Sequence, residues 1–442
     1  MKHLISKIAL VIFSLSLLSG GCDDQKETPA TTVNSETTMK TPFQFSGYEQ
    51  DWKKVDSLES QGLPKSALEI VNVIMDRASK EKNQPMQIKA LMYQLKLSQN
   101  LEEEDFSKSL ARIDELRKTN EEPLKQILAS IKADLLWMYL ENNRYNFYNR
   151  STTQNFDLGD VSTWDLKTLL DTSNKLFMES LENKEKLQQI PLKEYEYILT
   201  EINADSYLTA PTLYDFLAHR AITHFRNEET GITRPATKFS INDKRYFGTD
   251  AEFLSISTQT DDSLSQYLHY VKTMQELVRF HSKNNHVTAR MRNELDRLNF
   301  AYTASTIDTK TEWYKAALQR MQKEYAAYPV VGEVNAQLAE LYMDLGSKAE
   351  ATHPDYQLLK TANTLCNETI EKYPGTFGAR KCQIISQGLH QQSLSGDIER
   401  YTAANQPSLM KISFKNMDSV HVLIYQLRES EEYSYYYELK ER

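Results

Sequence analysis

Turn-forming residues are scarce in this chain. Only 13 glycines and 12 prolines occur among its 442 residues, too few for an all-β protein with many tight turns. A basic stripe is also missing, and the net charge of −9 argues against nucleic acid as the main partner. The chain is 40% hydrophobic and 26% charged, which is ordinary for a folded protein. The composition therefore favours a folded, mostly helical protein that does not bind nucleic acid.

The sequence begins with an apolar run that is too short to cross a bilayer. Residues 8–18 form this run, whereas a spanning helix needs about 20 apolar residues. Lys2 and Lys7 give it a positively charged start. This pattern is typical of a signal peptide. We therefore expect residues 1–21 to be removed and the mature protein to lie outside the cytoplasm, where disulfides can form.

A cysteine directly follows this segment. Residues 19–21 are small and Cys22 comes next, an order that resembles a bacterial lipoprotein signal, in which the cysteine becomes the lipidated N-terminus. We expect acyl chains on Cys22 to anchor the protein to the outer membrane of the cell envelope, on its periplasmic or surface side. Ser19 stands where the lipoprotein pattern has leucine, so an ordinary secretory signal with an incidental cysteine is the alternative. Residues 22–46, which have no apolar periodicity, are expected to be a flexible tether.

Helical patterns separated by breaks fill residues 47–396. One break contains Gly62 and Pro64, with an apolar run at helical spacing on each side, and residues 227–257 form the longest irregular insertion. Near the end of the region, two helical units contain Tyr-Pro steps, and the first unit is close to the tetratricopeptide pattern of about 34 residues. We therefore expect an all-α fold, an α-solenoid of tetratricopeptide-like helical pairs. An irregular all-helical domain is the alternative.

The best-marked helix lies in the middle of this region, at residues 211–225. Thr212 can cap its N-terminus, and the Asp215 side chain can bind the Thr212 amide in return, as in a capping box. Leucine, phenylalanine and alanine recur on one face at helical spacing. The helix also contains His219 and His224, which makes it the first place to look for chemistry.

Neither histidine is expected to be catalytic or to bind a metal. His219 lies four residues after Asp215, so the two side chains could form a hydrogen bond. However, no nucleophile occurs at a recognisable spacing, and Asp215 is already explained as part of the cap. His219 and His224 are five residues apart, about 140° around a helix, which is wrong for one metal ion. We expect no catalytic residue, no enzyme activity, no metal and no cofactor.

Two cysteines remain beyond the N-terminal segment. Cys366 and Cys382 lie equally far on either side of Pro374, in the expected turn between two helices, and should lie at the same level of the helical pair. A disulfide needs Cα atoms within about 7 Å, whereas packed helix axes are usually about 8–10 Å apart. Two buried thiols are the expected state. A Cys366–Cys382 disulfide, which requires an unusually close approach of the helices, is the alternative.

The hydrophobic period changes after residue 398. Residues 409–414 and 419–427 each show an alternation of period two, with a turn between them, which is typical of a β-hairpin. A hairpin alone is not stable, and residues 407–442 are too few for a β-sandwich of about 100 residues. We expect residues 407–442 to be the start of an incomplete β-sandwich domain, or a hairpin that docks onto another structure.

Four stretches resemble one protein family. They are residues 164–170 (WDLKTLL), 209–221 (TAPTLYDFLAHRA), 371–382 (EKYPGTFGARKC) and 408–427 (SLMKISFKNMDSVHVLIYQL). These stretches are similar to the N-terminal region of the large bacterial alpha-2-macroglobulin family proteins. Members of that family are envelope-anchored lipoproteins in which helical repeats precede a series of β-sandwich domains. The resemblance implies that the expected hairpin opens the first macroglobulin domain.

The resemblance also implies a role in protease trapping. In this family a protease cuts a bait segment, the molecule collapses around the protease, and in many members a thioester at Cys-Gly-Glu-Gln captures it covalently. Here Cys366 is followed by Asn-Glu-Thr and Cys382 by Gln-Ile-Ile, and no bait segment can be identified. The chain is therefore expected to be the anchoring and scaffold region of a macroglobulin-like endopeptidase inhibitor, which meets host or competitor proteases only through further C-terminal domains. The alternative is a glycan-binding outer-membrane lipoprotein with a tetratricopeptide-like fold.

Overall fold

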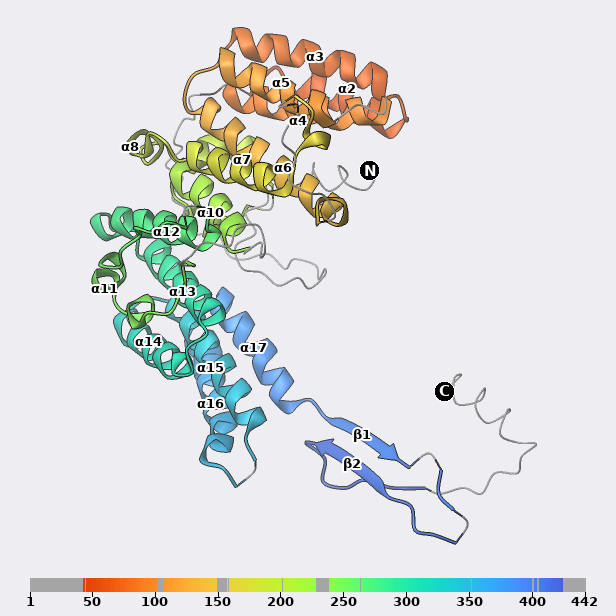
Figure 1. Ribbon diagram of the computed structural model, residues 1–442, viewed down its shortest axis with the longest axis vertical. Helices are drawn as coiled ribbons and strands as arrows, with labels where there is room; N and C mark the ends of the chain where they lie inside the picture. Colours follow the sequence, from red (N-terminus) through yellow and green to blue (C-terminus); the bar gives the residue numbers. More distant parts are fainter. Residues whose placement is uncertain are drawn as a thin grey trace, which may run out of the picture. The chain divides into compact units, whose positions relative to one another are not determined.

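The computed structural model describes residues 43–423, apart from residues 44, 102–105, 149–156, 158, 201, 228–237, 263, 351, 400 and 404. The described chain is mostly helical, with a small two-stranded antiparallel sheet near its C-terminal end (Figure 1). It divides into two compact units, one ending at Ala317 and the other beginning at Leu318. The expected mostly helical fold is therefore confirmed.

The first unit is built from helices. Its α-helices are α2 (Glu49–Ser60), α3 (Pro64–Lys80), α4 (Gln84–Leu101), α5 (Phe106–Thr119), α6 (Leu124–Tyr148), α7 (Leu166–Glu179), α8 (Lys184–Leu187), α9 (Ala204–Thr209), α10 (Leu213–Phe225), α11 (Asp250–Leu254), α12 (Gln266–Lys283) and α13 (Val287–Ala304). Short 3-10 helices lie between them: η1 (Val161–Thr163), η2 (Leu192–Ile198) and η3 (Lys244–Phe247). The boundary between the two units falls within α14 (Lys310–Glu324).

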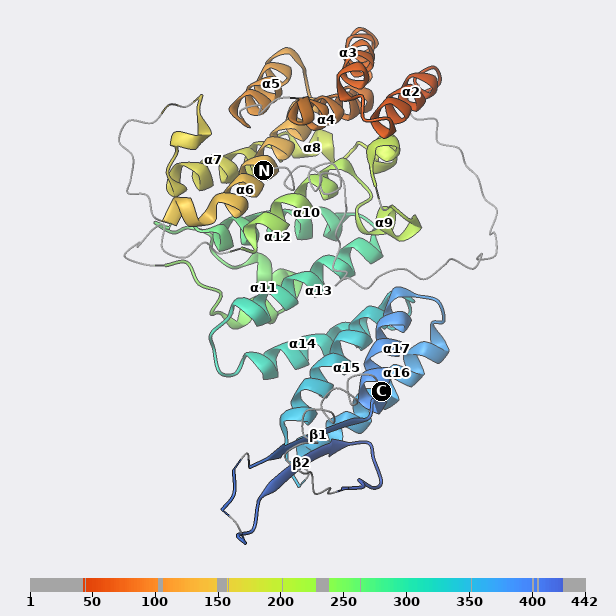
Figure 2. The ribbon, with the colours of Figure 1, turned by 90° about the vertical axis from the view of Figure 1, so that its right-hand side faces the viewer.

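Several helices of this unit pack against the next helix in the chain. Helix α3 packs against α4, α6 against α7, and α12 against α13, and the last pair is easily followed in Figure 2. Helix α10 departs from this order because it contacts α6, α7 and α12 together. Such contacts reach beyond the nearest neighbours that a simple solenoid uses. The regular α-solenoid of tetratricopeptide-like pairs therefore stays a prediction.

The second unit contains three helices that pack against one another. They are α15 (Val331–Lys348), α16 (Leu358–Lys372) and α17 (Phe377–His390), and the short η4 (Pro354–Gln357) precedes α16. Glycine permits the closest of these contacts. A Cβ atom on Gly378 would lie 2.1 Å from the carbonyl carbon of Gly332, so α17 and α15 touch through their backbones. Gly375, with φ of +76°, supplies the left-handed conformation in the turn before α17.

The sheet follows α17 and joins β1 (Ser393–Ile398) to β2 (Met410–Lys415). The strands are antiparallel and pair Ser393 with Lys415 at one end and Ile398 with Met410 at the other. The Asn416 side chain ties the end of β2 to the helix by donating to the backbone carbonyls of Leu389, at 2.7 Å, and Gln391, at 3.1 Å.

The pairing of the strands differs from the one expected from sequence. The strand expected at residues 409–414 is present, but its partner is β1 and not the segment 419–427. Residues 393–396, which the sequence places at the end of the helical region, belong to β1. The alternation of Leu394, Gly396 and Ile398 with polar residues is the pattern that a half-apolar strand requires. Residues 419–423 lie in no strand, and residues 424–427 fall outside the described part of the chain.

Candidate functional site

Helix α10 begins with the capping box expected from its sequence. The Thr212 hydroxyl oxygen accepts from the backbone amide of Asp215 at 3.3 Å, and Asp215 Oδ2 accepts from the Thr212 amide at 3.0 Å. These contacts satisfy two amides that a helix start leaves unpaired. The helix is buried on nearly all sides, and five of its polar side chains bind groups on four other helices.

Asp215 is the most enclosed of these polar residues. Its Oδ1 atom lies 2.7 Å from His281 Nε2 on α12, and both side chains are completely buried. Its Oδ2 atom also accepts from the Thr212 hydroxyl at 2.7 Å. The carboxylate is therefore saturated by Thr212 and His281. The hydrogen bond between Asp215 and His219 that the sequence permitted is not formed.

The two histidines of α10 each face an asparagine on a different helix. His219 Nε2 lies 2.8 Å from Asn293 Oδ1 on α13. His224 Nε2 lies 2.8 Å from Asn174 Oδ1 on α7. In each case the side-chain oxygen accepts, so the histidine donates from Nε2. The two histidines therefore point to different neighbours, in agreement with their five-residue spacing.

His224 sits in an aromatic core. The Phe177 ring stacks on it at 4.6 Å and the Trp137 ring meets it edge-on at 4.8 Å. Burial, with a smaller contribution from His269, lowers the pKa of His224 to about 3. Desolvation disfavours the charged form of a histidine, so His224 is neutral at physiological pH and serves as a hydrogen-bond donor within the core.

Two arginines complete the contacts of α10. Arg220 donates to Ser130 Oγ at 2.9 Å and forms an ion pair with Asp134, both on α6. Arg226, at the end of the helix, forms an ion pair with Asp296 on α13. Together with the aspartate and histidine contacts, these pairs join α10 to α6, α7, α12 and α13. We call this set of contacts the α10 network.

The order of groups in the α10 network is wrong for nucleophilic catalysis. A catalytic triad places histidine between the carboxylate and the hydroxyl, so that the imidazole can accept the hydroxyl proton. Here the Asp215 carboxylate lies between the other two groups, and the Thr212 hydroxyl donates to the carboxylate. The hydroxyl is held as a cap and not activated. The arrangement fits a buried clamp between helices.

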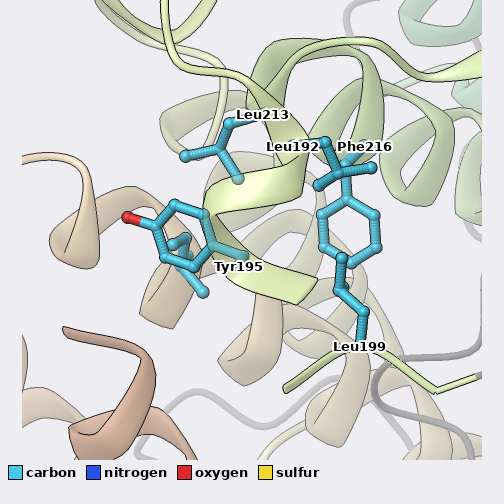
Figure 3. A pocket seen from close by; sticks show the side chains of 6 residues that line it. Leu192, Tyr195, Leu199, Leu213 and Phe216 are labelled. Carbon is cyan, nitrogen blue, oxygen red and sulfur yellow. The ribbon is translucent and has the colours of Figure 1, made fainter. Parts of the chain in front are cut away.

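A pocket beside α10 offers no room for a substrate. It lies beside the start of α10 and is shown in Figure 3. Its walls are apolar apart from one phenol, and they comprise Ile127, Leu192, Tyr195, Leu199, Leu213 and Phe216. The space between these side chains is too narrow to admit a water molecule. The Tyr195 hydroxyl is already used, since it donates to Gln84 Oε1 at 2.9 Å.

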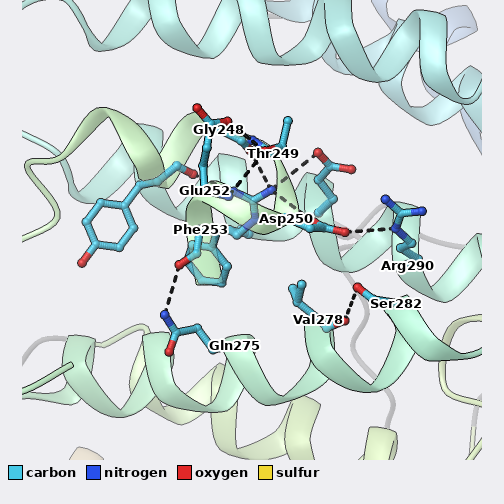
Figure 4. A network of polar contacts seen from close by, with 12 residues as sticks. Gly248, Thr249, Asp250, Glu252, Phe253, Gln275, Val278, Ser282 and Arg290 are labelled. Atoms are coloured by element: carbon cyan, nitrogen blue, oxygen red, sulfur yellow. Dashed lines mark hydrogen bonds and ion pairs between the residues drawn. The ribbon is translucent and has the colours of Figure 1, made fainter. Parts of the chain in front are cut away.

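A second buried polar cluster surrounds Arg297 on α13, and its members Gly248 and Asp250 are labelled in Figure 4. The side chain is 1% exposed and its guanidinium donates to the backbone carbonyls of Tyr246, at 2.9 Å, and Gly248, at 3.1 Å. Glu294 lies 3.5 Å and Asp250 3.7 Å from its Nη2 atom. The cluster holds part of the insertion expected at residues 227–257, which contains η3 and α11, against the helical core. The Nη1 and Nη2 donors of Arg297 are directed at protein groups, as expected for a structural cluster.

One cysteine of the chain lies near its N-terminus, and the other two lie in the second unit. Cys22 lies outside the described residues. Cys366 on α16 and Cys382 on α17 are both completely buried and are free thiols in this structure. The interaction with the Cys382 thiol, together with burial, raises the pKa of the Cys366 thiol.

Within the described ranges, no three side chains of histidine, cysteine, aspartate or glutamate are gathered as a metal site would require. No helix in the same ranges combines the length and the apolar character needed to cross a bilayer. Comparisons of the chain with family models, with curated proteins and with solved structures found no match.

Sequence reasoning identified the residues of α10 but not their partners. His281, Asn293 and Asn174 lie 66, 74 and 50 residues away from the groups they bind. Nothing in their local sequence marks them as buried hydrogen-bonding residues. The only signal was on α10 itself, where a polar side chain in a mostly apolar helix implies a buried partner.

Proposed function

We propose that this chain is the anchoring and scaffold region of a macroglobulin-like endopeptidase inhibitor of the bacterial envelope, attached to the outer membrane by a lipid on Cys22. In this proposal the chain itself catalyses no reaction. The first unit supplies the support, because side chains of the α10 network and of the Arg297 cluster hydrogen-bond between its helices and loops. Support for the protease-defence role comes from the sheet that follows α17.

One face of this sheet is apolar. Side chains alternate between the two faces of a strand, and the register places the apolar residues of β1 directly opposite those of β2. The serine, aspartate and lysine residues of both strands lie on the other face. We define the apolar face as Leu394, Ile398, Met410, Ile412 and Phe414.

The apolar face is largely exposed in the described part of the chain, and this observation carries the proposal. Leu394 is 52% exposed, and Ile398 and Phe414 are each 61% exposed. Two strands alone are not stable in water, and a sheet with one apolar face gains stability by packing that face on a second sheet, as in a β-sandwich. We infer that the occupant is a sheet of a macroglobulin-type β-sandwich domain. The helices would then carry that domain at the membrane.

A binding experiment tests this scaffold role. A recombinant β-sandwich domain from a bacterial macroglobulin is titrated into the full chain by calorimetry. We expect saturable binding that the double variant Ile398→Ser/Phe414→Ser weakens by at least about tenfold, since each buried apolar side chain contributes ~1.5–3 kcal/mol. The matched control is Ser395→Ala/Ser413→Ala, which changes a directly paired position on the opposite face and should leave the affinity unchanged.

Two results would contradict the proposal. The first is a lack of binding, or binding that the two double variants affect equally, because the apolar face would then not be the docking surface. The second is saturable binding of envelope oligosaccharides by the same preparation in the absence of any β-domain binding. That result would favour a glycan-binding lipoprotein.

A further inference from the structure

The two cysteines of the second unit come from consecutive helices that pack closely. Cys366 lies on α16 and Cys382 on α17, and a short turn containing Gly375 joins the helices. Both side chains are 0% exposed. Helix α16 packs against α17, and each thiol affects the pKa of the other. The two cysteine side chains therefore lie next to each other in the interface between the helices.

Small residues explain why the helices can come so near. Ala362 lies one turn before Cys366 and Ala379 about one turn before Cys382, and both alanines are buried. Small side chains next to both cysteines allow α16 and α17 to pack more closely than large side chains would. This weakens the usual objection to a disulfide between two packed helices, namely the distance between their axes.

We propose that Cys366 and Cys382 form a dithiol that is oxidised to a disulfide between α16 and α17. The oxidant is a disulfide-bearing molecule, either a small-molecule disulfide or a disulfide-exchange enzyme of the oxidising compartment into which the signal segment is expected to direct the chain. This modification site is independent of the scaffold role, because it lies on α16 and α17 and not on the sheet.

The exchange balances in two steps. The thiolate of one cysteine attacks the oxidant disulfide, forms a mixed disulfide and releases one thiol of the oxidant. The second cysteine then attacks the protein sulfur of the mixed disulfide, the Cys366–Cys382 bond forms, and the second oxidant thiol leaves. The protein loses two protons and two electrons, and the oxidant is reduced to two thiols.

The burial of both thiols predicts slow oxidation of the folded protein. A disulfide in solution reaches the sulfur atoms only when α17 opens locally, so the reaction should accelerate in mild denaturant that leaves the protein mostly folded. Once formed, the bond closes a short loop around the turn at Gly375. In the chain-entropy account such a bond stabilises the folded state, and we expect an upward shift of the thermal midpoint by roughly 5–10 °C.

The test compares two redox states of the full chain and needs no variant. One sample is kept in dithiothreitol and the other is equilibrated with oxidised glutathione in mild denaturant, and the remaining thiols are then alkylated after complete unfolding. Peptide mass analysis of the oxidised sample should show the segments containing Cys366 and Cys382 joined by a disulfide. The thermal midpoint of this sample should exceed that of the reduced one.

The double variant Cys366→Ala/Cys382→Ala is the matched control, since alanine already occupies neighbouring positions of this interface. Its thermal midpoint should be the same under oxidising and reducing conditions. Alkylation of both cysteines after equilibration with oxidised glutathione would overturn the proposal. So would stable glutathione adducts or links between two chains in place of the internal bond.

Discussion

Replacement of His224 by glutamine should remove part of the acid sensitivity of the first unit. The pKa of His224 is lowered from 6.5 to about 3 in the folded protein, so the unfolded chain binds an extra proton at every pH between these values. This contribution to stability is complete above pH 6.5, is lost as the pH falls below 6.5, and stops changing near pH 3. Glutamine can still donate to Asn174 but does not titrate.

The magnitude follows from the pKa difference. Each unit of pKa shift corresponds to about 1.4 kcal/mol, and between pH 7.5 and pH 5 only part of the shift is expressed. The folded state should therefore lose about 2 kcal/mol over this interval because of His224 alone. In the His224→Gln variant this part of the loss should be absent, whatever the contributions of other groups.

Urea unfolding followed by tryptophan fluorescence measures this difference. All four tryptophans of the chain precede residue 318, so the signal reports the first unit. The matched control is His421→Gln, which changes an exposed histidine and should keep the acid sensitivity of the parent. Equal losses of unfolding free energy between pH 7.5 and pH 5 in the parent and in His224→Gln would refute the assignment of a neutral, buried His224.

Three further predictions concern unfolding free energies measured in denaturant. Arg297→Met should destabilise the first unit by about 3–5 kcal/mol, because it leaves buried carboxylates and carbonyls without their donor. The control Arg290→Met, at a more exposed position, should cost under about 1 kcal/mol. Similar costs for the two variants would contradict the structural role of the Arg297 cluster. Gly378→Ala should destabilise the second unit by at least about 1–3 kcal/mol, because the added Cβ atom overpacks the contact between α17 and α15. The control Gly388→Ala adds a Cβ atom that meets nothing within 4 Å, so it should be neutral or stabilising by up to about 1 kcal/mol. Thr212→Val should cost about 1–2 kcal/mol and Thr212→Ser much less; equal losses would argue against the capping box.

Local features of the fold could be predicted from the sequence, because they depend on residues a few positions apart. The Thr212–Asp215 capping box, the helical face of α10 and the strand near residue 410 all have such short-range signals. The contacts of Asp215 and His224 could not be predicted, because each partner lies on another helix at a large sequence separation. The partner of β2 was missed for a related reason. Residues 393–398 and 419–427 both show an alternation of period two, so either segment could pair with β2. Residues 393–398 are available for pairing because α17 ends at His390, and the sequence does not mark that end clearly.

The cysteines show the same division between local and long-range information. Their equal distance from Pro374 predicted that they lie at one level of a helical pair, and the structure buries both of them where α16 and α17 pack together. The backbone contact between Gly332 and Gly378 could not be predicted, because it joins two helices that are not consecutive in the chain.

The scaffold role is tested most directly by the protease response of the native envelope protein. Antibodies against this chain are used to isolate the native protein from the envelope, and the preparation is incubated with an endopeptidase. Cleavage of a large protein substrate and of a small peptide is then measured, with a mock-isolated sample as the control. A trapped protease is reachable only by small molecules, so we expect cleavage of the large substrate to fall severalfold while cleavage of the small peptide is retained. Unchanged cleavage of both substrates would contradict the proposed function.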